Sequence, residues 1–274
     1  MIIRDRMKTY QKVLCLAGSD SSGGAGVQAD LKTISALGCY GMTVITALTS
    51  QNTQGVTAIY AVPPDFVEAQ MTTVIEDMSA DSVKIGMLYS SEIIQVVCDL
   101  LQKYDLQNVV LDPVMASQSG RQLLQEDAII LVKSLLLPQV DLLMPNLPEA
   151  EILLGRRIQG EDAIKKAACD LSRMGCDNIM IKGGHLEGLD TTDWLYLGKP
   201  DRFIRFQGSR VKTVNDHGTG CTLSSAVASF LAKGLALEDA VRSAKIYITE
   251  ALQAGAAYTI GKGRGPVHHF YKYW

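Results

Sequence analysis

Short apolar runs alternate along the chain with longer segments in which apolar residues recur three and four positions apart. The short runs predict β-strands, and the longer segments predict amphipathic helices. The predicted strands are Val13–Ala17, Met42–Thr49, Val83–Met87, Asn108–Val114, Asp141–Pro145 and Asn178–Lys182. The predicted helices between them are Gln28–Leu37, Asp65–Met78, Ser91–Tyr104, Glu126–Leu136, Pro148–Leu154 and Asp162–Met174. This order indicates βαβ units around a mostly parallel sheet, and the nearly continuous apolar strands favour helices on both of its faces.

The alternation changes in the last third of the chain. Two segments with the pattern of an antiparallel strand pair at a sheet edge are followed by two helices: Thr192–Leu197, Arg202–Gln207, Gly218–Lys233 and Leu237–Ala256. No linker rich in Pro, Ser or Gly divides the chain, and no repeat is visible. We therefore expect one α/β domain over residues 13–274, preceded by a polar extension of residues 1–12.

Composition and charge narrow the class of protein. Hydrophobic residues make up 47% of the 274 residues and charged residues 20%, which is ample for a core. The net charge of −3 predicts that neither nucleic acid nor an anionic membrane is a partner. The six cysteines form no CxxC pair, the polar start lacks an apolar signal segment, and no apolar run is long enough to span a bilayer. We expect a protein of the reducing cytoplasm.

Polar and glycine residues gather where the predicted strands end. They are Gly18-Ser19-Asp20, Gln51-Asn52, Gly86-Met87, Asp112-Pro113-Val114, Pro145-Asn146 and Lys182-Gly183-Gly184. In a parallel α/β sheet, ligands bind in the crevice outside the carboxyl ends of the strands. The sequence therefore predicts a small-molecule site at that end of the sheet.

A glycine-rich turn from Gly18 to Gly26 joins the first predicted strand to the first helix. Glycine permits positive φ and lets the backbone approach a ligand closely. Residues 24–29 match G-x-G-x-x-A, the dinucleotide-binding fingerprint, but no Asp or Glu occurs from Met42 to Tyr60, where the ribose-binding acid is expected. This gap disfavours a nicotinamide dehydrogenase, and a purely structural turn remains open.

A second glycine motif, Gly218-Thr219-Gly220, leads directly into a helix of small residues. Free amides at a helix N-terminus form an anion site together with the helix dipole, although a plain glycine-started helix is the alternative. No G-x-x-x-x-G-K-[ST] string occurs, so the motif is not a P-loop. Cys221 lies in the first turn, where the helix end is expected to lower the pKa of its thiol. A buried apolar cysteine is the alternative.

Three oxygen-bearing side chains, Asp112, Asn146 and Glu149, lie at or just after two predicted strand ends. Asn146 and Glu149 have the spacing of a helix capping box. Asp112 stands before a proline and caps nothing evident. Together their oxygens suit a magnesium ion that keeps waters and bridges phosphates. The capping and the metal-binding interpretations both stay open.

These stretches together resemble the hydroxymethylpyrimidine/phosphomethylpyrimidine kinases of thiamine synthesis, in the pyridoxal-kinase-like branch of the ribokinase family. The matching strings are AGSDSSGGAGVQADLKT (17–33), ITALTSQNTQGV (45–56), VKIGML (83–88), VVLDPVM (109–115), MPNLPEAEIL (144–153), MIKGGH (180–185), DHGTGCTLSSA (216–226) and GKGRGPVHHF (261–270). The resemblance implies a ribokinase-like, three-layer αβα fold, ATP and Mg²⁺ as cofactors, and a homodimer.

The resemblance also implies roles for individual residues. Those that would contact the aminopyrimidine are Asp30, Gln51 and the backbone near Gly18 by hydrogen bonds, and Ala25, Met87 and Val114 as walls. Those that would form the anion hole for the moving phosphoryl group are Gly218, Thr219, Gly220 and Cys221, with Cys221 nearest the acceptor hydroxyl. Lys182 and Thr219 would bind the ATP phosphates. Asp112, Asn146 and Glu149 would handle magnesium and its waters.

Cys221 stands where most ribokinase relatives carry Asp, and Cys at this position is typical of the pyrimidine kinases and some pyridoxal kinases. A weak base suffices for a site that phosphorylates an alcohol and then an already ionised phosphate, which favours a bifunctional enzyme. A pyridoxal kinase on the same scaffold is the nearest alternative, since an aldehyde can form a hemithioacetal with Cys221. A non-catalytic vitamin- or nucleotide-binding protein is the alternative of another class. Asp216 stands where a neutral residue is expected.

Overall fold

An eight-stranded sheet runs through the centre of the computed structural model, which describes residues 8–116, 120, 122–183 and 190–274. Residues 1–7 of the predicted extension and residues 184 and 185 of a matching string lie outside the described residues. The strand order is β10-β9-β8-β7-β6-β5-β1-β2. The strands are β1 Lys12–Ala17, β2 Tyr40–Ile45, β5 Ser82–Ile85, β6 Val109–Leu111, β7 Leu142–Leu143, β8 Asn178–Ile181, β9 Asp190–Leu197 and β10 Arg202–Ser209.

The strands from β2 to β8 in this order pair in parallel, whereas β9 and β10 are antiparallel additions at one edge. The prediction of a mostly parallel sheet is therefore confirmed, and the antiparallel pair also lies where the pattern placed it. One-directional pairing brings the carboxyl ends of six strands to the same end of the sheet, and the predicted polar and glycine residues directly follow five of them. Gln51 and Asn52 instead lie in a separate hairpin after β2.

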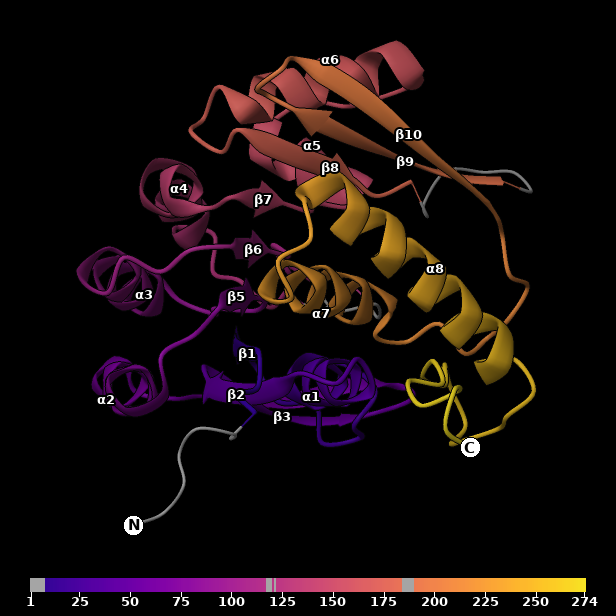
Figure 1. The fold of residues 1–274 in the computed structure, drawn as a ribbon, viewed down its shortest axis with the longest axis horizontal. Helices are drawn as coiled ribbons and strands as arrows, with labels where there is room; N and C mark the ends of the chain where they lie inside the picture. The colour runs from indigo at the N-terminus through magenta and orange to yellow at the C-terminus, as the bar shows by residue number, and fades with distance from the viewer. Residues whose placement is uncertain (1–7, 117–119, 121, 184–189) are drawn as a thin grey trace.

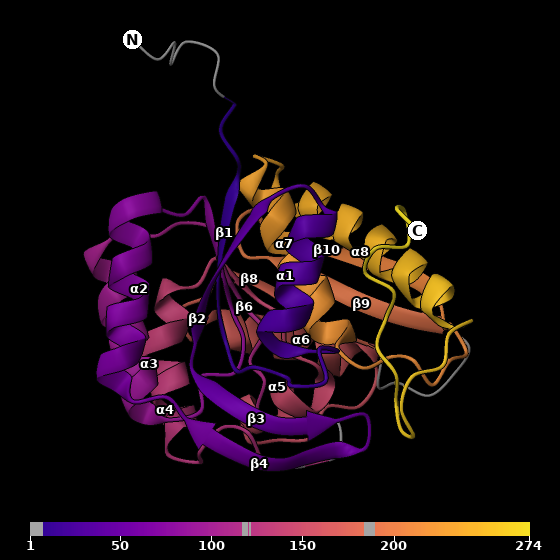
Figure 2. The same cartoon turned by 90° about the horizontal axis from the view of Figure 1, so that it is seen from below.

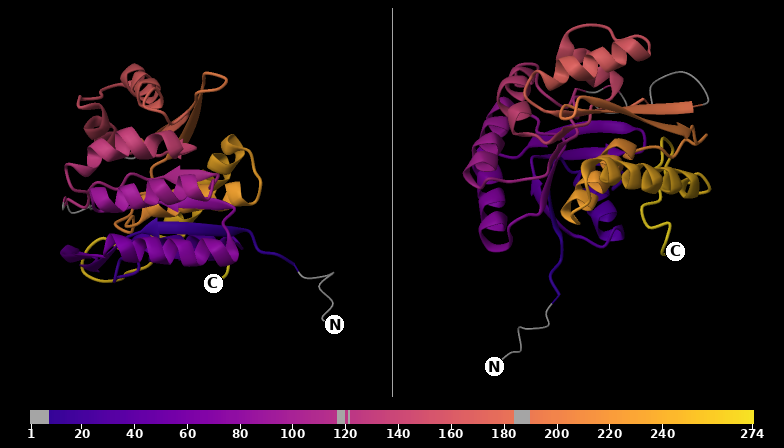
Figure 3. Two further views of the ribbon diagram at one scale, coloured as in Figure 1. Left: turned by 90° about the vertical axis from the view of Figure 1, so that its left-hand side faces the viewer. Right: turned by 45° about the horizontal axis from the view of Figure 1, so that its top comes forward.

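Helices cover both faces of the sheet (Figure 1). They are α1 Gly26–Ala36, α2 Pro64–Met78, α3 Ser91–Lys103, α4 Ala128–Leu131, α5 Leu147–Leu154, α6 Glu161–Ser172, α7 Thr219–Ala232 and α8 Leu237–Gly255. The helices α2, α3 and α4 lie together on one face, as Figure 3 shows from the side, and α1, α7 and α8 lie on the other. The expected ribokinase-like, three-layer αβα architecture is confirmed.

The alternation of side chains along β1 explains the two cores. Leu14 and Leu16 pack into the cluster that includes α2 to α6, while Val13 and Cys15 pack into the cluster formed with α1, α7 and α8. All four side chains are fully buried, and burial of one such aliphatic side chain contributes about 1.5–3 kcal/mol. A strand that is apolar on both sides thus fixes helices on both sides.

None of the helices in the described ranges is long and apolar enough to cross a membrane.

The predicted strand Met42–Thr49 is wrong as a single element. The chain leaves the main sheet after β2, and Ala47–Asn52 forms β3, which pairs antiparallel with β4 (Gly55–Ala61) in a separate hairpin (Figure 2). Thr46 marks the break: its amide donates to Ala17 O over 3.1 Å and its hydroxyl to Met87 O over 2.6 Å. The continuous apolar pattern concealed this break because both strands contribute buried residues. The segment predicted as the helix Glu126–Leu136 is α4 followed by a π-helical turn, Val132–Leu136.

Candidate active site at the carboxyl ends of the strands

The two glycine motifs pack directly against each other at the carboxyl end of β1. Gly218 has φ +78°, and a Cβ added to it would lie 1.8 Å from the carbonyl oxygen of Gly24. A Cβ on Gly24 would lie 2.4 Å from Cδ2 of His217. Only glycine fits at both positions, so the small residues of the two motifs bring the loop before α1 against the start of α7.

The first turn of α7 presents free backbone amides. Gly218 occupies the N-cap position in the left-handed conformation and provides no side-chain cap. Thr219 donates its amide to Asp216 O over 3.3 Å, but the amides of Gly220 and Cys221 have no acceptor among the described residues. Two consecutive free amides at the positive end of a 14-residue helix suit a phosphate oxygen.

A cation and two carboxylates lie beside these amides. Lys182 Nζ is 2.5 Å from Asp112 Oδ1 and 4.0 Å from Glu149 Oε2. Gly220 packs next to this group, since a Cβ added to it would lie 3.4 Å from Asp112 Oδ2 and 3.6 Å from Lys182 Nζ. Burial alone would lower the pKa of Lys182, but Asp112 and Glu149 raise it, so the ammonium keeps its charge. The structure thus brings the predicted nucleotide-binding lysine and both predicted carboxylates together near Gly220, at the start of α7.

Asn146 and Glu149 form the capping box of α5. The Asn146 amide oxygen accepts from the Glu149 backbone N–H over 2.8 Å, and Glu149 Oε2 accepts from the Asn146 N–H over 2.7 Å. The capping interpretation is therefore confirmed. Burial raises the pKa of Glu149 to about 7, although Lys182 opposes this shift. The metal-binding role of Asp112, Asn146 and Glu149 stays a prediction.

The oxygen atoms of these side chains can bind magnesium if water and substrate phosphates supply the remaining ligands. Among the described residues, no cluster of three or more His, Cys, Asp or Glu side chains is arranged to hold a metal. Magnesium bound through one or two carboxylates commonly completes its shell with waters and substrate phosphates. Asp112 and Glu149, which both lie within 4.0 Å of Lys182 Nζ, fit such a shared site and not an all-protein cage.

Cys221 corrects the expected thiol chemistry. Its residue is half-buried at the start of α7, and burial raises the pKa of the thiol to about 11. Lys84 and a hydrogen bond with the Gly26 backbone lower it, while the carboxylates of Asp30 and Asp112 raise it further. The prediction that the helix N-terminus makes a thiolate is therefore wrong: desolvation and two nearby carboxylates outweigh the helix end.

Asp30 also differs from its expected setting. Its carboxylate is fully buried, and both oxygens accept hydrogen bonds, from Lys84 at 2.9 and 3.0 Å and from Ser225 at 2.7 Å. No exposed acceptor remains on this side chain in the structure. Direct contact between Asp30 and a pyrimidine stays a prediction, and its pairing with Lys84 was not foreseen.

The other predicted pyrimidine contacts lie around an apolar cluster. Met87 is buried with Ala47, and Val114 packs against them. A Cβ on Gly18 would lie 3.0 Å from the Met87 sulfur. On the polar side, Gln51 Nε2 lies 3.3 Å from His217 Nε2. Gln51 thus faces the loop that begins α7, and the predicted walls and the predicted polar reader lie at one end of the sheet.

Ala25 is the N-cap residue of α1, and its amide donates to Asp20 Oδ2 over 2.8 Å. The same Asp20 carboxylate pairs with His217, and this pair was not predicted from the sequence. Asp20 is buried and its Oδ2 also lies 2.8 Å from His217 Nε2. Burial would raise the pKa of Asp20, but hydrogen bonds from His217, Ser22 and Ala25 lower it to about 2. The Asp in a Ser/Gly turn was the available signal, because such residues bind the backbone amides that follow them.

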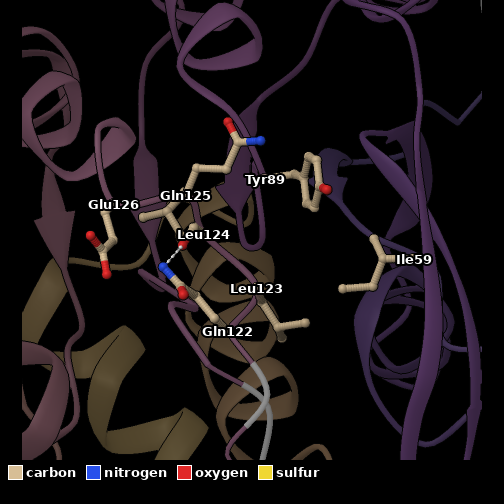
Figure 4. Close-up of a pocket in the computed structure, with 7 residues that line it drawn as sticks. All are labelled: Ile59, Tyr89, Gln122, Leu123, Leu124, Gln125 and Glu126. Atoms are coloured by element: carbon tan, nitrogen blue, oxygen red, sulfur yellow. Dashed lines mark hydrogen bonds between the residues drawn. The ribbon is translucent and has the colours of Figure 1, made fainter.

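A cavity of about 370 Å³ opens beside the apolar cluster (Figure 4). It is lined by Ile59, Tyr89, Gln122, Leu123, Leu124, Gln125 and Glu126. Leu123 belongs to the same buried cluster as Met87, and Ile59 and Tyr89 pack against that cluster. The cavity therefore adjoins the walls expected for the pyrimidine.

Comparison with known proteins gives one consistent family. The profile of the family described as phosphomethylpyrimidine kinase matches residues 20–268. The hydroxymethylpyrimidine/phosphomethylpyrimidine kinase of Escherichia coli K12 is 47% identical, covering 95% of this chain and 98% of the relative. The Rhizobium meliloti enzyme of the same name is 48% identical, covering 95% and 97%.

Solved structures agree with this result. The phosphomethylpyrimidine kinase of Clostridium difficile 630 matches with a TM-score of 0.78 and 43% identity, covering 88% of this chain and 99% of that chain. The pyridoxal kinase of Staphylococcus aureus, in complex with AMP-PCP and pyridoxal, matches with a TM-score of 0.87 and 32% identity, covering 96% and 94%. Since the profile and relatives that are nearly half identical span almost the whole chain, the chain belongs to the phosphomethylpyrimidine kinase family.

Proposed function

We propose that this protein transfers the γ-phosphoryl group of ATP to the hydroxymethyl group of 4-amino-5-hydroxymethyl-2-methylpyrimidine and then phosphorylates the monophosphate to the diphosphate, in thiamine biosynthesis. The observation that carries the proposal is the pair of free amides at Gly220 and Cys221, beside the Lys182–Asp112 ion pair. The name shared by the relatives supports both reactions. Complexes of the pyridoxal kinase neighbour with an ATP analogue support ATP as the donor.

In each reaction an acceptor oxygen attacks the γ-phosphorus as the bond from phosphorus to the ADP oxygen breaks. The amides of Gly220 and Cys221 would hold the oxygens of the moving group, and Lys182 would neutralise charge on the phosphates. Asp112 and Glu149 would hold magnesium, which would supply further positive charge to neutralise the phosphates. These residues act by position and charge, which is most of what phosphoryl transfer requires.

The two acceptors differ in their need for a base. The alcohol must lose a proton as it attacks, whereas the monophosphate arrives ionised. The thiolate of Cys221 would accept the alcohol proton, although the raised pKa of Cys221 makes this thiolate the minor form before the substrate binds. The second step needs no such base, because its acceptor is already ionised.

A pyridoxal kinase is the second candidate, because pyridoxal kinases are among the solved structures with TM-scores of 0.87. An ATP-consumption assay with hydroxymethylpyrimidine, its monophosphate and pyridoxal separates the two. We expect kcat/KM for both pyrimidines to exceed that for pyridoxal. Turnover of pyridoxal alone would establish the second candidate, and no turnover with any acceptor would contradict kinase activity.

We further propose that the protein acts as a cytoplasmic homodimer. The β3–β4 hairpin supports this because Leu48 and Tyr60 are directly opposite each other and are 46% and 68% exposed. Such an apolar cross-strand pair on a projecting hairpin suits contact with a second copy. Lysine at both positions should shift the mass measured by light scattering from dimer to monomer, and an unchanged dimer would exclude this face.

A further inference from the structure

A second lysine lies buried close to the start of α7. Lys84 on β5 and Asp30 on α1 are both fully buried, with Lys84 Nζ 2.9 and 3.0 Å from the two carboxylate oxygens. Ser225, in the second turn of α7, donates to Asp30 Oδ1 over 2.7 Å. The three side chains therefore join the sheet, α1 and α7 at a point without solvent contact.

Stability alone gives little reason for this arrangement. Moving two charges out of water costs several kcal/mol, and buried ion pairs are often replaced by apolar side chains without loss. An ammonium has three N–H groups, but the described residues offer Lys84 only the two oxygens of Asp30. One side of the Lys84 charge is thus left without a hydrogen-bonded counter-charge.

That charge acts on the active site. A Cβ on Gly86 would lie 3.0 Å from Lys84 Nζ, so the glycine after β5 leaves the space that the ammonium needs. Burial raises the pKa of the Cys221 thiol, and the charge of Lys84 opposes this shift. Burial alone would lower the pKa of Lys84, but Asp30, Cys221 and Asp112 raise it, so the side chain is charged at neutral pH. The ammonium thus lies beside the backbone after β5, and its partner Asp30 links it to α7 through Ser225.

We propose that Lys84 is a positioning residue for phosphoryl transfer: through Asp30 and Ser225 it fixes the first turns of α7, and its charge stabilises the moving phosphoryl group held by the amides of Gly220 and Cys221. This inference rests on the proposed kinase function. A fixed positive charge in a dry site stabilises developing negative charge without any reorganisation. Lys182 is the matching cation at the open side of the site, and Lys84 acts from the protein interior without touching substrate.

The test is a variant in which both charges are removed. Lys84→Met combined with Asp30→Asn keeps side-chain size and avoids a single unpaired buried charge. We expect a melting temperature close to wild type, with kcat at saturating substrates lowered about 10-fold to 100-fold for both pyrimidine acceptors. A well-folded variant whose kcat stays within about twofold of wild type would overturn the proposal.

If the double variant does not fold, Ser225→Ala keeps the ion pair but releases α7 from it. A kcat unchanged by Ser225→Ala would also overturn the proposal, and a loss of about fivefold or more would support it.

A second measurement requires no pyrimidine. ADP with aluminium fluoride mimics the phosphoryl group in transfer, and calorimetry gives its Kd beside that of ADP alone. The double variant should bind ADP like wild type but lose about 10-fold or more of the tightening that aluminium fluoride provides. Equal tightening would contradict a role for the Lys84 charge. Failure of the wild-type protein to phosphorylate either pyrimidine would instead reject the proposed function. The two failures can be told apart, because the binding test needs no pyrimidine and still reports on Lys84. Arg156→Met with Asp170→Asn, which removes a partly exposed ion pair between the end of α5 and α6, is the control expected to change neither quantity.

Discussion

Two glycines set how closely the two glycine-rich loops approach each other, and the contact between Asp20 and His217 joins the same loops. Gly218 lies against the carbonyl of Gly24, and Gly24 lies against the ring of His217. The free amides of Gly220 and Cys221 depend on this contact, because it holds the chain in the left-handed conformation that begins α7. Backbone geometry therefore leaves these amides free, and the neighbouring side chains supply charge.

Gly218→Ala tests this dependence. The new Cβ would be strained at positive φ and would collide with Gly24 O, so the loops must move apart. We expect a loss of stability and a fall in kcat of about 10²-fold, as for a misplacement of about 1 Å. Gly234→Ala is the matched control: its φ of +82° gives the same strain, but nothing lies within 4 Å of the added Cβ. Gly234→Ala should cost about 1–2 kcal/mol in unfolding free energy and leave kcat unchanged. Equal kinetic effects of the two variants would show that the close contact is irrelevant to catalysis.

Cys221→Ala separates the two candidate roles of the cysteine. If Cys221 is the base, phosphorylation of the alcohol should slow by about 10²–10⁴-fold, while phosphorylation of the monophosphate should change far less. The amide of residue 221 is retained, so the anion hole survives. The two rates are measured on one preparation, and their ratio is the result, since any damage to the fold cancels. A parallel fall of both rates would mean that Cys221 packs the site, and unchanged rates would make it an ordinary helix residue.

The residues that carry local patterns could be predicted, and those that depend on distant partners could not. The glycine motifs, the capping box at Asn146 and the free amides at Gly220 and Cys221 follow from neighbours in the sequence. The pairs Asp20–His217 and Asp30–Ser225 join residues 197 and 195 positions apart, and no local pattern signals them. The pKa of Cys221 was wrongly predicted for the same reason, because the direction of its shift depends on burial and on carboxylates from other elements.

At the scale of elements, a C-terminal strap, defined here as residues 261–266, ties the β3–β4 hairpin to the start of α7. Arg264 donates its amide to Thr53 O in the hairpin turn over 2.9 Å, and its guanidinium pairs with Asp216. Gly265 O accepts from the His217 N–H over 2.9 Å. Asp216 thus has a cation beside it, which accounts for a carboxylate at a position where a neutral residue was expected. The strap was recognised in the sequence only as a matching string, since its role lies in contacts with two distant loops.

Gly263→Ala tests the strap. A Cβ on Gly263 would lie 2.0 Å from Thr53 O, so the variant must separate the strap from the hairpin that carries Gln51. We expect KM for the pyrimidine to rise by about 10-fold, because a misplaced polar contact loses about 1–3 kcal/mol. The Kd for ADP should not change. Gly208→Ala on β10 is the control, since its added Cβ has only an ordinary contact of 3.6 Å with Thr191. An unchanged KM for Gly263→Ala would remove the hairpin's position from substrate binding.

At the scale of the whole molecule, the parallel sheet was the most predictable feature. Its strands are apolar on both sides, as β1 illustrates, and this pattern allows few arrangements other than a sheet between two helix layers. The candidate site is then a consequence of strand direction, which gathers residues after five parallel strands at one end, and the β3–β4 hairpin adds Gln51. The detached hairpin at Ala47–Ala61 could not be predicted in the same way, because alternating or apolar residues fit a hairpin and a central strand equally well.

The response of the whole fold to pH depends on buried groups with opposite effects. His269 is buried in the contact between the C-terminal segment and α7, with Nε2 3.0 Å from the Thr222 hydroxyl. Burial, Lys32 and His268 lower the pKa of His269 from 6.5 to about 3. Between these values the unfolded chain binds a proton that the folded protein does not bind. Its contribution to stability is therefore complete above pH 6.5 and is lost as the pH falls toward about 3. Glu149 has a raised pKa and acts in the opposite direction over part of this range.

His269→Gln should remove the histidine's part of this dependence while retaining a polar atom near the position of Nε2. We expect the unfolding free energy of wild type to fall more steeply than that of His269→Gln between about pH 6 and pH 4.5, by at most about 1.4 kcal/mol per pH unit. Urea titrations of both proteins at matched pH values give this difference directly. Glu149 and the exposed carboxylates contribute equally to both proteins and cancel in the comparison. At about pH 7.5 the histidine is neutral in both folded and unfolded wild type, so any remaining difference there measures the lost packing alone. Parallel lines across the whole range would mean that His269 is protonated in the folded protein and is not enclosed as the structure has it.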